Sequence, residues 1–178
     1  MFDSLELSPG MTVLRNTDAL SEVPARGATL VIMGVPSQPG VEERMASDLE
    51  RFASAGARVV IAFTPEWPAL ERAPRASEGE HPDKKSLFER MGVKLARRTI
   101  KRRDEAAVPS FEGIPRKTAL SFDTLSPDWT IHRSEQKSAV VIERPWHSGS
   151  LVLVSDSWPL SNEALSRQPD ARELAWLI

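Results

Sequence analysis

Cysteine is absent from all 178 residues of the chain. A chain without thiols forms no disulfide, has no thiolate nucleophile, and holds neither a zinc ion nor an iron–sulfur cluster through cysteine. The absence also removes cysteine usage as a guide to the redox compartment.

Long apolar stretches are missing as well. The longest cover about six to eight residues, whereas a membrane-spanning helix needs roughly 20, and the first residues lack the apolar segment of a signal peptide. We therefore expect the chain as given to be soluble. Residues 2–5 are typical of the end of a helix, and residues 173–178 form another apolar-periodic stretch. This suggests that residues 1–178 are a single α/β domain excised from a longer protein.

The sequence has little net charge. Its 23 basic and 25 acidic residues leave a formal net charge of -2, which argues against a general binder of polyanions, so we expect no nucleic-acid partner. One local exception is RRTIKRR, at residues 97–103. We interpret this run as a solvated edge strand blunted by charge, and contact with nucleic acid or anionic lipid is the alternative.

A βαβ unit is predicted between residues 29 and 63. The runs TLVIMG (29–34) and RVVIAF (58–63) are continuous and apolar, as in strands that are covered on both faces. Between them, apolar residues recur at helical spacing, and Gly56 stands where a left-handed helix cap is expected. The helical residues are Val41, Met45, Leu49 and Phe52.

The C-terminal half predicts an antiparallel meander. Its strand candidates are residues 129–133, 139–145 and 150–155, and the connections between them are short enough for hairpins. Other expected elements are a strand at 11–16, a helix at 86–91 that ends at Gly92, a strand at 93–100, and an exposed loop at 64–85. The predicted fold class is therefore α/β: a three-layer sandwich whose mixed sheet has parallel N-terminal strands and helices on both faces.

Small and polar residues follow the predicted strands. In an open α/β sheet, ligands bind beyond the carboxyl ends of the parallel strands. If the strands pair as predicted, position 16 and residues 34–37, 64–67 and 156–162 share that edge. The candidate ligand-binding residues on it are Asn16, Gly34, Ser37, Asp156, Ser157, Trp158 and Asn162.

Asp156 has two possible roles on this edge. In the structural role, its carboxylate accepts hydrogen bonds from N–H groups of its own loop, while Ser161 or Asn162 caps a helix that begins near Glu163. In the functional role, it contacts a ligand or joins a carboxylate site for Mg²⁺ or Ca²⁺. We favour the structural role, because the functional one needs partners that the sequence does not show.

No recognisable catalytic pattern accompanies these residues. Ser155 or Ser157 with His147 and Asp156 has the composition of a hydrolase triad, but the G-x-S-x-G elbow does not occur. We therefore expect no catalytic residue in this chain.

Metal and phosphate patterns are absent too. His81, His132 and His147 are far apart, and none has a partner at metal-ligand spacing. The loop from Gly34 to Gly40 matches neither the dinucleotide nor the Walker glycine pattern. We interpret it as a plain connection between strand and helix, and a phosphate-binding loop at the start of the helix is the alternative. We expect no metal and no cofactor.

The C-terminal third, VVIERPWHSGSLVLVSDSWPLSNEAL followed by ELAWLI, resembles a bacterial family known as domain of unknown function 4350. The segments VLRNTDAL, ATLVIMGVP, GARVVIAF and LFERMGVKL fit the same pattern in the same order. The resemblance implies a flavodoxin-like or class I glutamine-amidotransferase-like sandwich, flanked by transmembrane helices and often encoded near MoxR-type ATPases. Amidotransferases of this fold need a cysteine nucleophile, which this chain lacks, so the resemblance brings no activity.

Two functions remain open. The first is a non-catalytic ligand-binding or protein-interaction domain of a membrane-anchored bacterial protein, anchored by segments outside this chain. Its expected partners are other membrane proteins or a MoxR-type ATPase system. The alternative is a degenerate or unrecognised hydrolase on an amidotransferase-like scaffold, which a clustered Ser/His/Asp geometry at the strand-end edge would favour.

Overall fold

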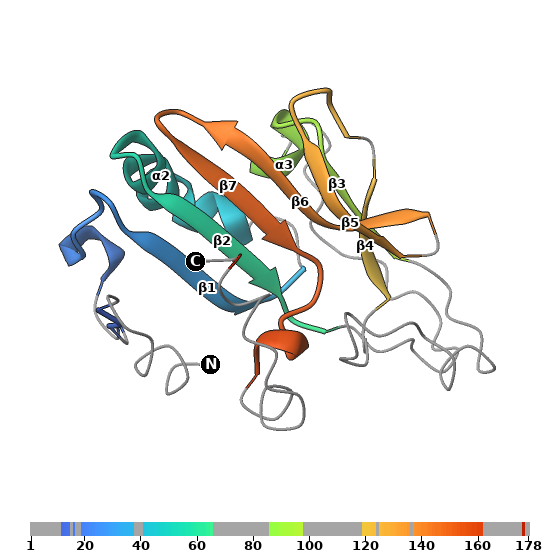
Figure 1. Ribbon diagram of the computed structural model, residues 1–178, viewed down its shortest axis with the longest axis horizontal. Helices are drawn as coiled ribbons and strands as arrows, with labels where there is room; N and C mark the ends of the chain where they lie inside the picture. The colour runs from blue at the N-terminus through green and yellow to red at the C-terminus, as the bar shows by residue number, and fades with distance from the viewer. Residues whose placement is uncertain are drawn as a thin grey trace.

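The computed structural model describes residues 12–14, 16, 19–37, 41–65, 86–97, 119–123, 125–135, 137–161 and 176. Its centre is a seven-stranded mixed sheet with the order β1-β2-β7-β6-β4-β3, in which β5 also pairs with β6 (Figure 1). The strands are β1 (Thr29–Val35), β2 (Arg58–Phe63), β3 (Lys94–Arg97), β4 (Leu120–Asp123), β5 (Thr130–Glu135), β6 (Ser138–Trp146) and β7 (Gly149–Val154). The helices are α2 (Val41–Ser54) and α3 (Leu87–Arg90), with 3-10 turns η1 (Leu20–Glu22) and η2 (Trp158–Leu160).

The predicted βαβ unit is confirmed. Strands β1 and β2 are parallel neighbours, and α2 connects them across one face of the sheet. Leu49 and Phe52 of α2 are buried, as the helical spacing of the apolar residues predicts. The helix ends before Gly56, whose φ of 84° is the left-handed conformation that glycine adopts without a steric penalty.

The predicted meander is also confirmed. Strands β5, β6 and β7 pair antiparallel in chain order, and tight turns join them. Lys137 and His147 lie in these turns with φ values of 68° and 53°. Beyond the hairpin, β7 pairs in parallel with β2, so the last strand of the meander becomes a central strand of the sheet.

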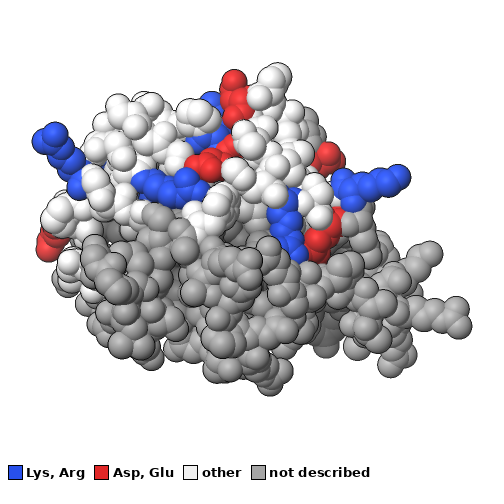
Figure 2. All heavy atoms as spheres, in the orientation of Figure 1, with Lys and Arg blue, Asp and Glu red and all other residues white. Residues whose placement is uncertain are grey.

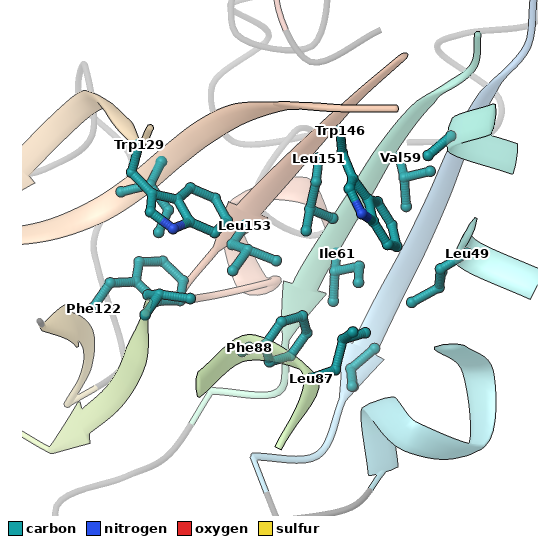
Figure 3. Close-up of a cluster of buried hydrophobic side chains, with 14 of the residues drawn as sticks. Leu49, Val59, Ile61, Leu87, Phe88, Phe122, Trp129, Trp146, Leu151 and Leu153 are labelled. Atoms are coloured by element: carbon teal, nitrogen blue, oxygen red, sulfur yellow. The ribbon is translucent and has the colours of Figure 1, made fainter. Parts of the chain in front are cut away.

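Apolar side chains are buried on both faces of the central strands. Alternate residues of β2 and β7 point to opposite sides, which explains why these strands are continuous apolar runs in the sequence. One face packs against α2 and α3 (Figure 3), through Val59, Ile61, Leu151 and Leu153 against Leu49, Phe52, Leu87 and Phe88. The opposite face holds a second cluster of Val60, Ala62, Val140, Val141, Val152, Val154 and Leu160.

The short elements α3 and β3 follow one another in the chain, and β3 lies at the end of the strand order opposite β1. Helix α3 begins with a capping box: Glu89 N–H donates to Ser86 Oγ at 3.2 Å, and Ser86 N–H donates to Glu89 Oε2 at 3.0 Å. The chain then turns at Gly92 into β3, an end strand of the sheet that finishes at Arg97. The strand predicted at 93–100 is thus confirmed for residues 94–97. Of the basic run at 97–103, interpreted as a charged edge strand, only Arg97 is described, and it ends this end strand of the sheet.

Three sequence expectations need correction or restriction. The predicted strand at 11–16 is wrong for its described residues, because residues 12–14 and 16 have no strand geometry and Val13 packs against the second apolar cluster instead. Strand β4 has no counterpart among the predicted strands. The prediction of helices on both faces of the sheet is also not met in the described part. Helices α2 and α3 cover the same face. The described residues that pack on the other face include Val13 and Leu160, and they form no α-helical layer there.

Candidate functional site

The carboxyl ends of three parallel strands lie side by side. β2 is flanked by β1 on one side and by β7 on the other, and the chain leaves all three in the same direction (Figure 1). Backbone hydrogen bonds join the segments that follow: Thr64 N–H donates to Val35 O at 2.8 Å, and Ser157 N–H donates to Phe63 O at 2.7 Å. These segments, residues 34–37, 64–65 and 155–158, form what we call the strand-end site.

Gly34 allows β1 to end in an irregular register. The pairing between β1 and β2 shifts between Met33 and Val35, and Gly34 has a φ of 70°, which L-residues rarely adopt. A Cβ atom on Gly34 would meet only Thr64 Oγ1, at 3.9 Å. The glycine is therefore required by backbone conformation and not by lack of space.

The SDS sequence at the end of β7 folds into a buried turn. Ser155, Asp156 and Ser157 are 1%, 3% and 8% exposed. The Asp156 carboxylate is held in place because its Oδ1 accepts a hydrogen bond from Trp158 N–H at 2.8 Å. Ser155 N–H donates to Val140 O at 3.0 Å, which extends the β6–β7 pairing. This hydrogen bond within its own loop is the one that the structural role of Asp156 predicts.

The 3-10 turn η2 follows directly. A proline occupies its first turn, where the missing N–H does not disturb hydrogen bonding, and the buried Leu160 anchors the turn to the second apolar cluster. The helix expected near Glu163 lies outside the described residues, as does its proposed cap Asn162.

The other predicted residues are spread around this turn. Ser37 and Trp158 are half-buried, whereas Gly34 and Thr64 are exposed. Asn16 is exposed too, but it belongs to a segment outside the sheet and is not one of the residues that follow β1, β2 or β7. Residues 66 and 67 of the predicted edge lie outside the described part.

The described histidines lie away from the serines. His147 is in the turn before β7 and Ser155 comes directly after β7, so the six-residue strand separates them by roughly 20 Å. His132 Nε2 lies 2.9 Å from Glu143 Oε2, and Glu143 is paired with Val152, three residues before Ser155. His81 lies outside the described residues. The geometry therefore does not bring His132 or His147 to Ser155 or Ser157 as a general base.

A second polar cluster was missed by the sequence reasoning. Arg58, His132 and Glu143 come together on the sheet near the amino ends of β2 and β7, opposite the strand-end site. Its signal in the sequence is a charged residue next to an apolar run: Arg58 stands before VVIAF and Glu143 after AVVI. Pairing between distant strands, which a single sequence does not give, is needed to join them.

The described residues show neither a metal-binding cluster nor a membrane-spanning helix. Within the described ranges, no three or more histidine, aspartate or glutamate side chains are grouped so as to hold a metal ion. None of the described helices has both the length and the apolar character needed to cross a membrane. Basic and acidic side chains are interspersed over the described part of the face in Figure 2.

Comparison with known proteins identifies a family match. The family model described as "Domain of unknown function (DUF4350)" matches residues 4–178. No curated protein matches the chain. A solved structure, the exo-beta-1,4-mannosidase Op5Man5 from Opitutaceae bacterium strain TAV5, is similar with 17% sequence identity and a TM-score of 0.45. The match covers 90% of this chain but 25% of the mannosidase, so the chain spans about a quarter of that protein's length.

Proposed function

Because the chain belongs to the DUF4350 family, whose description names no activity, we propose its function from its geometry: a non-catalytic domain that binds a ligand or a partner protein at the strand-end site. The observation that carries the proposal is the alignment of the carboxyl ends of β1, β2 and β7 around the buried Ser155–Ser157 turn. Open α/β sheets bind ligands at this position. The flavodoxin-like or class I glutamine-amidotransferase-like scaffold is part of the same proposal.

The buried turn supports binding over hydrolysis. A catalytic serine has to expose its hydroxyl to substrate and hydrogen-bond to a base. Ser155 is 1% exposed, and the described histidines lie toward the opposite end of β7. Asp156, the residue that would orient a histidine in a triad, accepts the Trp158 N–H instead.

The surroundings of the turn provide the contact surface. Thr64 and Gly34 are exposed beside it, and Ser37 and Trp158 are half-buried. A partly exposed indole gives a large contact area with few rotatable bonds, and a hydroxyl group adds directional hydrogen bonding. This combination is suited to a small polar ligand or to a loop of another protein.

The family resemblance supports a cellular setting for this proposal. We propose that the domain works in a membrane-anchored protein and that its partners are other membrane proteins or a MoxR-type ATPase system. This part rests on the family and not on any contact in the structure.

Site-specific photo-crosslinking in the native host tests the binding proposal. A photoreactive residue in place of exposed Thr64 is expected to give a discrete crosslinked product, because Thr64 borders the strand-end site. The matched control is Thr130, an exposed threonine on β5. A product formed equally from both positions, or from Thr130 alone, would count against this site.

A further inference from the structure

Three prolines follow the parallel strands whose carboxyl ends form the strand-end site. Pro36 comes directly after β1, Pro65 is the second residue after β2, and Pro159 lies in η2, the turn that follows β7. Proline has no backbone N–H group. Where a strand end of an α/β protein binds a phosphate or a carboxylate, backbone N–H groups of the loop and of the next helix hold that anion. Each of the three strand ends therefore has one donor fewer for an anion.

The N–H groups next to these prolines are already engaged within the protein. Thr64 N–H and Ser157 N–H donate to carbonyl groups of the neighbouring strand ends, at 2.8 and 2.7 Å. Trp158 N–H donates to Asp156 Oδ1 at 2.8 Å. An anion could take these donors only by breaking the contacts that join the strand ends, which leaves the acceptors without their hydrogen bonds.

Charge at the strand-end site also disfavours an anion. Its described residues include no lysine, arginine or histidine, and the one ionisable side chain among them is the carboxylate of Asp156. The first turn of α2, the helix after β1, contains Glu43, which pairs with Arg90 at 2.8 Å. The positive end of this helix dipole thus lies near a carboxylate of the protein itself. Neither the described side chains of the site nor this helix supplies uncompensated positive charge to a phosphate.

A cation is disfavoured for a different reason. Asp156 is 3% exposed, and its Oδ1 accepts the Trp158 N–H. A cation that paired with this carboxylate would have to lose its hydration shell and enter the turn, at a cost that a single carboxylate does not offset. The site therefore favours a neutral ligand.

The groups at the surface of the site are suited to a ligand with hydroxyl groups. Thr64 is exposed, and its Oγ1 lies 3.9 Å from the position that a Cβ atom on Gly34 would occupy. Because Gly34 is exposed and has no side chain, a ligand can approach the backbone beside this hydroxyl. Trp158 is half-buried and adds a flat apolar surface. A polyol or a sugar has hydroxyl groups for the first contact and C–H groups for the second.

We propose that the strand-end site selects a neutral ligand rich in hydroxyl groups, a polyol or a sugar, and rejects phosphates and carboxylates. This inference rests on the binding function proposed above and adds the chemical class of the ligand. Within the site, the hydroxyl of Thr64 forms a hydrogen bond to the ligand.

A titration of the ¹⁵N-labelled protein with matched probes tests the ligand class. Glucose, ribose and glycerol are each compared, at constant ionic strength, with the phosphate ester of the same compound, so that the members of a pair differ only in the phosphate group. We expect at least one neutral probe to shift the amide signals of Gly34, Thr64 and Ser157 saturably. Its phosphate ester should bind there about tenfold more weakly or not at all, because it adds charge that the site does not neutralise.

Substitutions of Thr64 test the predicted hydrogen bond. Thr64→Val removes the hydroxyl and keeps the shape of the side chain, so the neutral probe should bind roughly two- to tenfold more weakly. Thr64→Ser keeps a hydroxyl and should bind the probe like the wild type. The matched control is Thr130→Val on β5, outside the site, which should leave binding unchanged. Unchanged amide signals in the rest of β2 show that each variant keeps the fold.

The possible failures can be told apart. A phosphate ester that binds at the same residues as tightly as its neutral partner would overturn the ligand class and leave the strand-end site in place. If no neutral probe shifts these signals, the ligand class is wrong, and if no ester shifts them either, the binding function proposed for the site fails as well. Unchanged binding in Thr64→Val, or equal weakening in Thr64→Val and Thr130→Val, would contradict the role of the Thr64 hydroxyl.

Discussion

Single residues at the strand ends have roles that follow from their burial. Asp156 is 3% exposed and accepts the Trp158 N–H at 2.8 Å, so its carboxylate stabilises the turn from within. Gly34 and Gly149 are needed for different reasons: the first for its positive φ, the second for space. Each reason gives a substitution whose effect on stability can be measured.

Replacing Asp156 by alanine leaves the part-buried Trp158 N–H without its acceptor. We expect Asp156→Ala to lower the free energy of unfolding by about 1 to 3 kcal/mol. Asp156→Asn keeps an acceptor oxygen in the same place and should lose less. Urea unfolding of both variants measures the difference. Wild-type stability in Asp156→Ala together with loss of binding would instead assign the carboxylate to a ligand.

Gly149 begins β7 against the loop that follows α2. A Cβ atom at this position would lie 2.0 Å from Ala57 O, and that oxygen belongs to the backbone, which cannot rotate away. We expect Gly149→Ala to lower the free energy of unfolding by about 3 kcal/mol or more.

Gly27→Ala is the control for the alanine substitution. Gly27 has a φ of 66°, and a Cβ atom at this position would meet nothing within 4 Å, so only backbone strain of about 1 to 2 kcal/mol is expected. Thermal or urea unfolding compares the two variants. Equal losses at Gly149 and Gly27 would contradict the steric explanation.

At the scale of elements, the strands and helices that the sequence predicts well are those with a full apolar pattern. β1, β2, β6 and β7 combine apolar runs with turn residues at their ends, and α2 has both its apolar spacing and Gly56. β4 has four residues and a single paired position with β6, Phe122 with Ala139, so long-range contacts form it. The reverse holds at residues 12–14, where Val13 packs on a cluster without joining the sheet.

Position in the sheet predicts how long each strand resists local opening. β2 and β7 have partners on both edges and buried residues on both faces, whereas β1 and β3 are the ends of the strand order. In native-state hydrogen exchange, we expect the amides of β2 and β7 to exchange only near the limit of global unfolding and those of β3 to exchange earlier. Faster exchange in β7 than in β3 would contradict the assigned core.

At the scale of the whole molecule, the parallel pairing of β7 with β2 determines how the two halves of the chain form one sheet. The hairpin between β6 and β7 is local and can be read from the sequence, but the parallel pairing of residues 58–62 with residues 150–154 spans about half the chain. The positions of the strand ends that border the candidate site were predicted, because residues 34–37 and 156–158 come at the ends of apolar runs. The Arg58–Glu143–His132 cluster was not, since its three members come from strands whose order no local pattern specifies.

The central claim is that the strand-end site binds without catalysing. The most direct measurement is a titration of the ¹⁵N-labelled protein with a panel of small carboxylates, phosphates and sugars, in which the probe signals are recorded over time. We predict saturable shifts that are concentrated at Gly34, Thr64 and Ser157, weakened in Thr64→Ala, with every probe chemically unchanged. Shifts concentrated elsewhere, or turnover of a probe that Ser155→Ala or Ser157→Ala abolishes, would contradict the account.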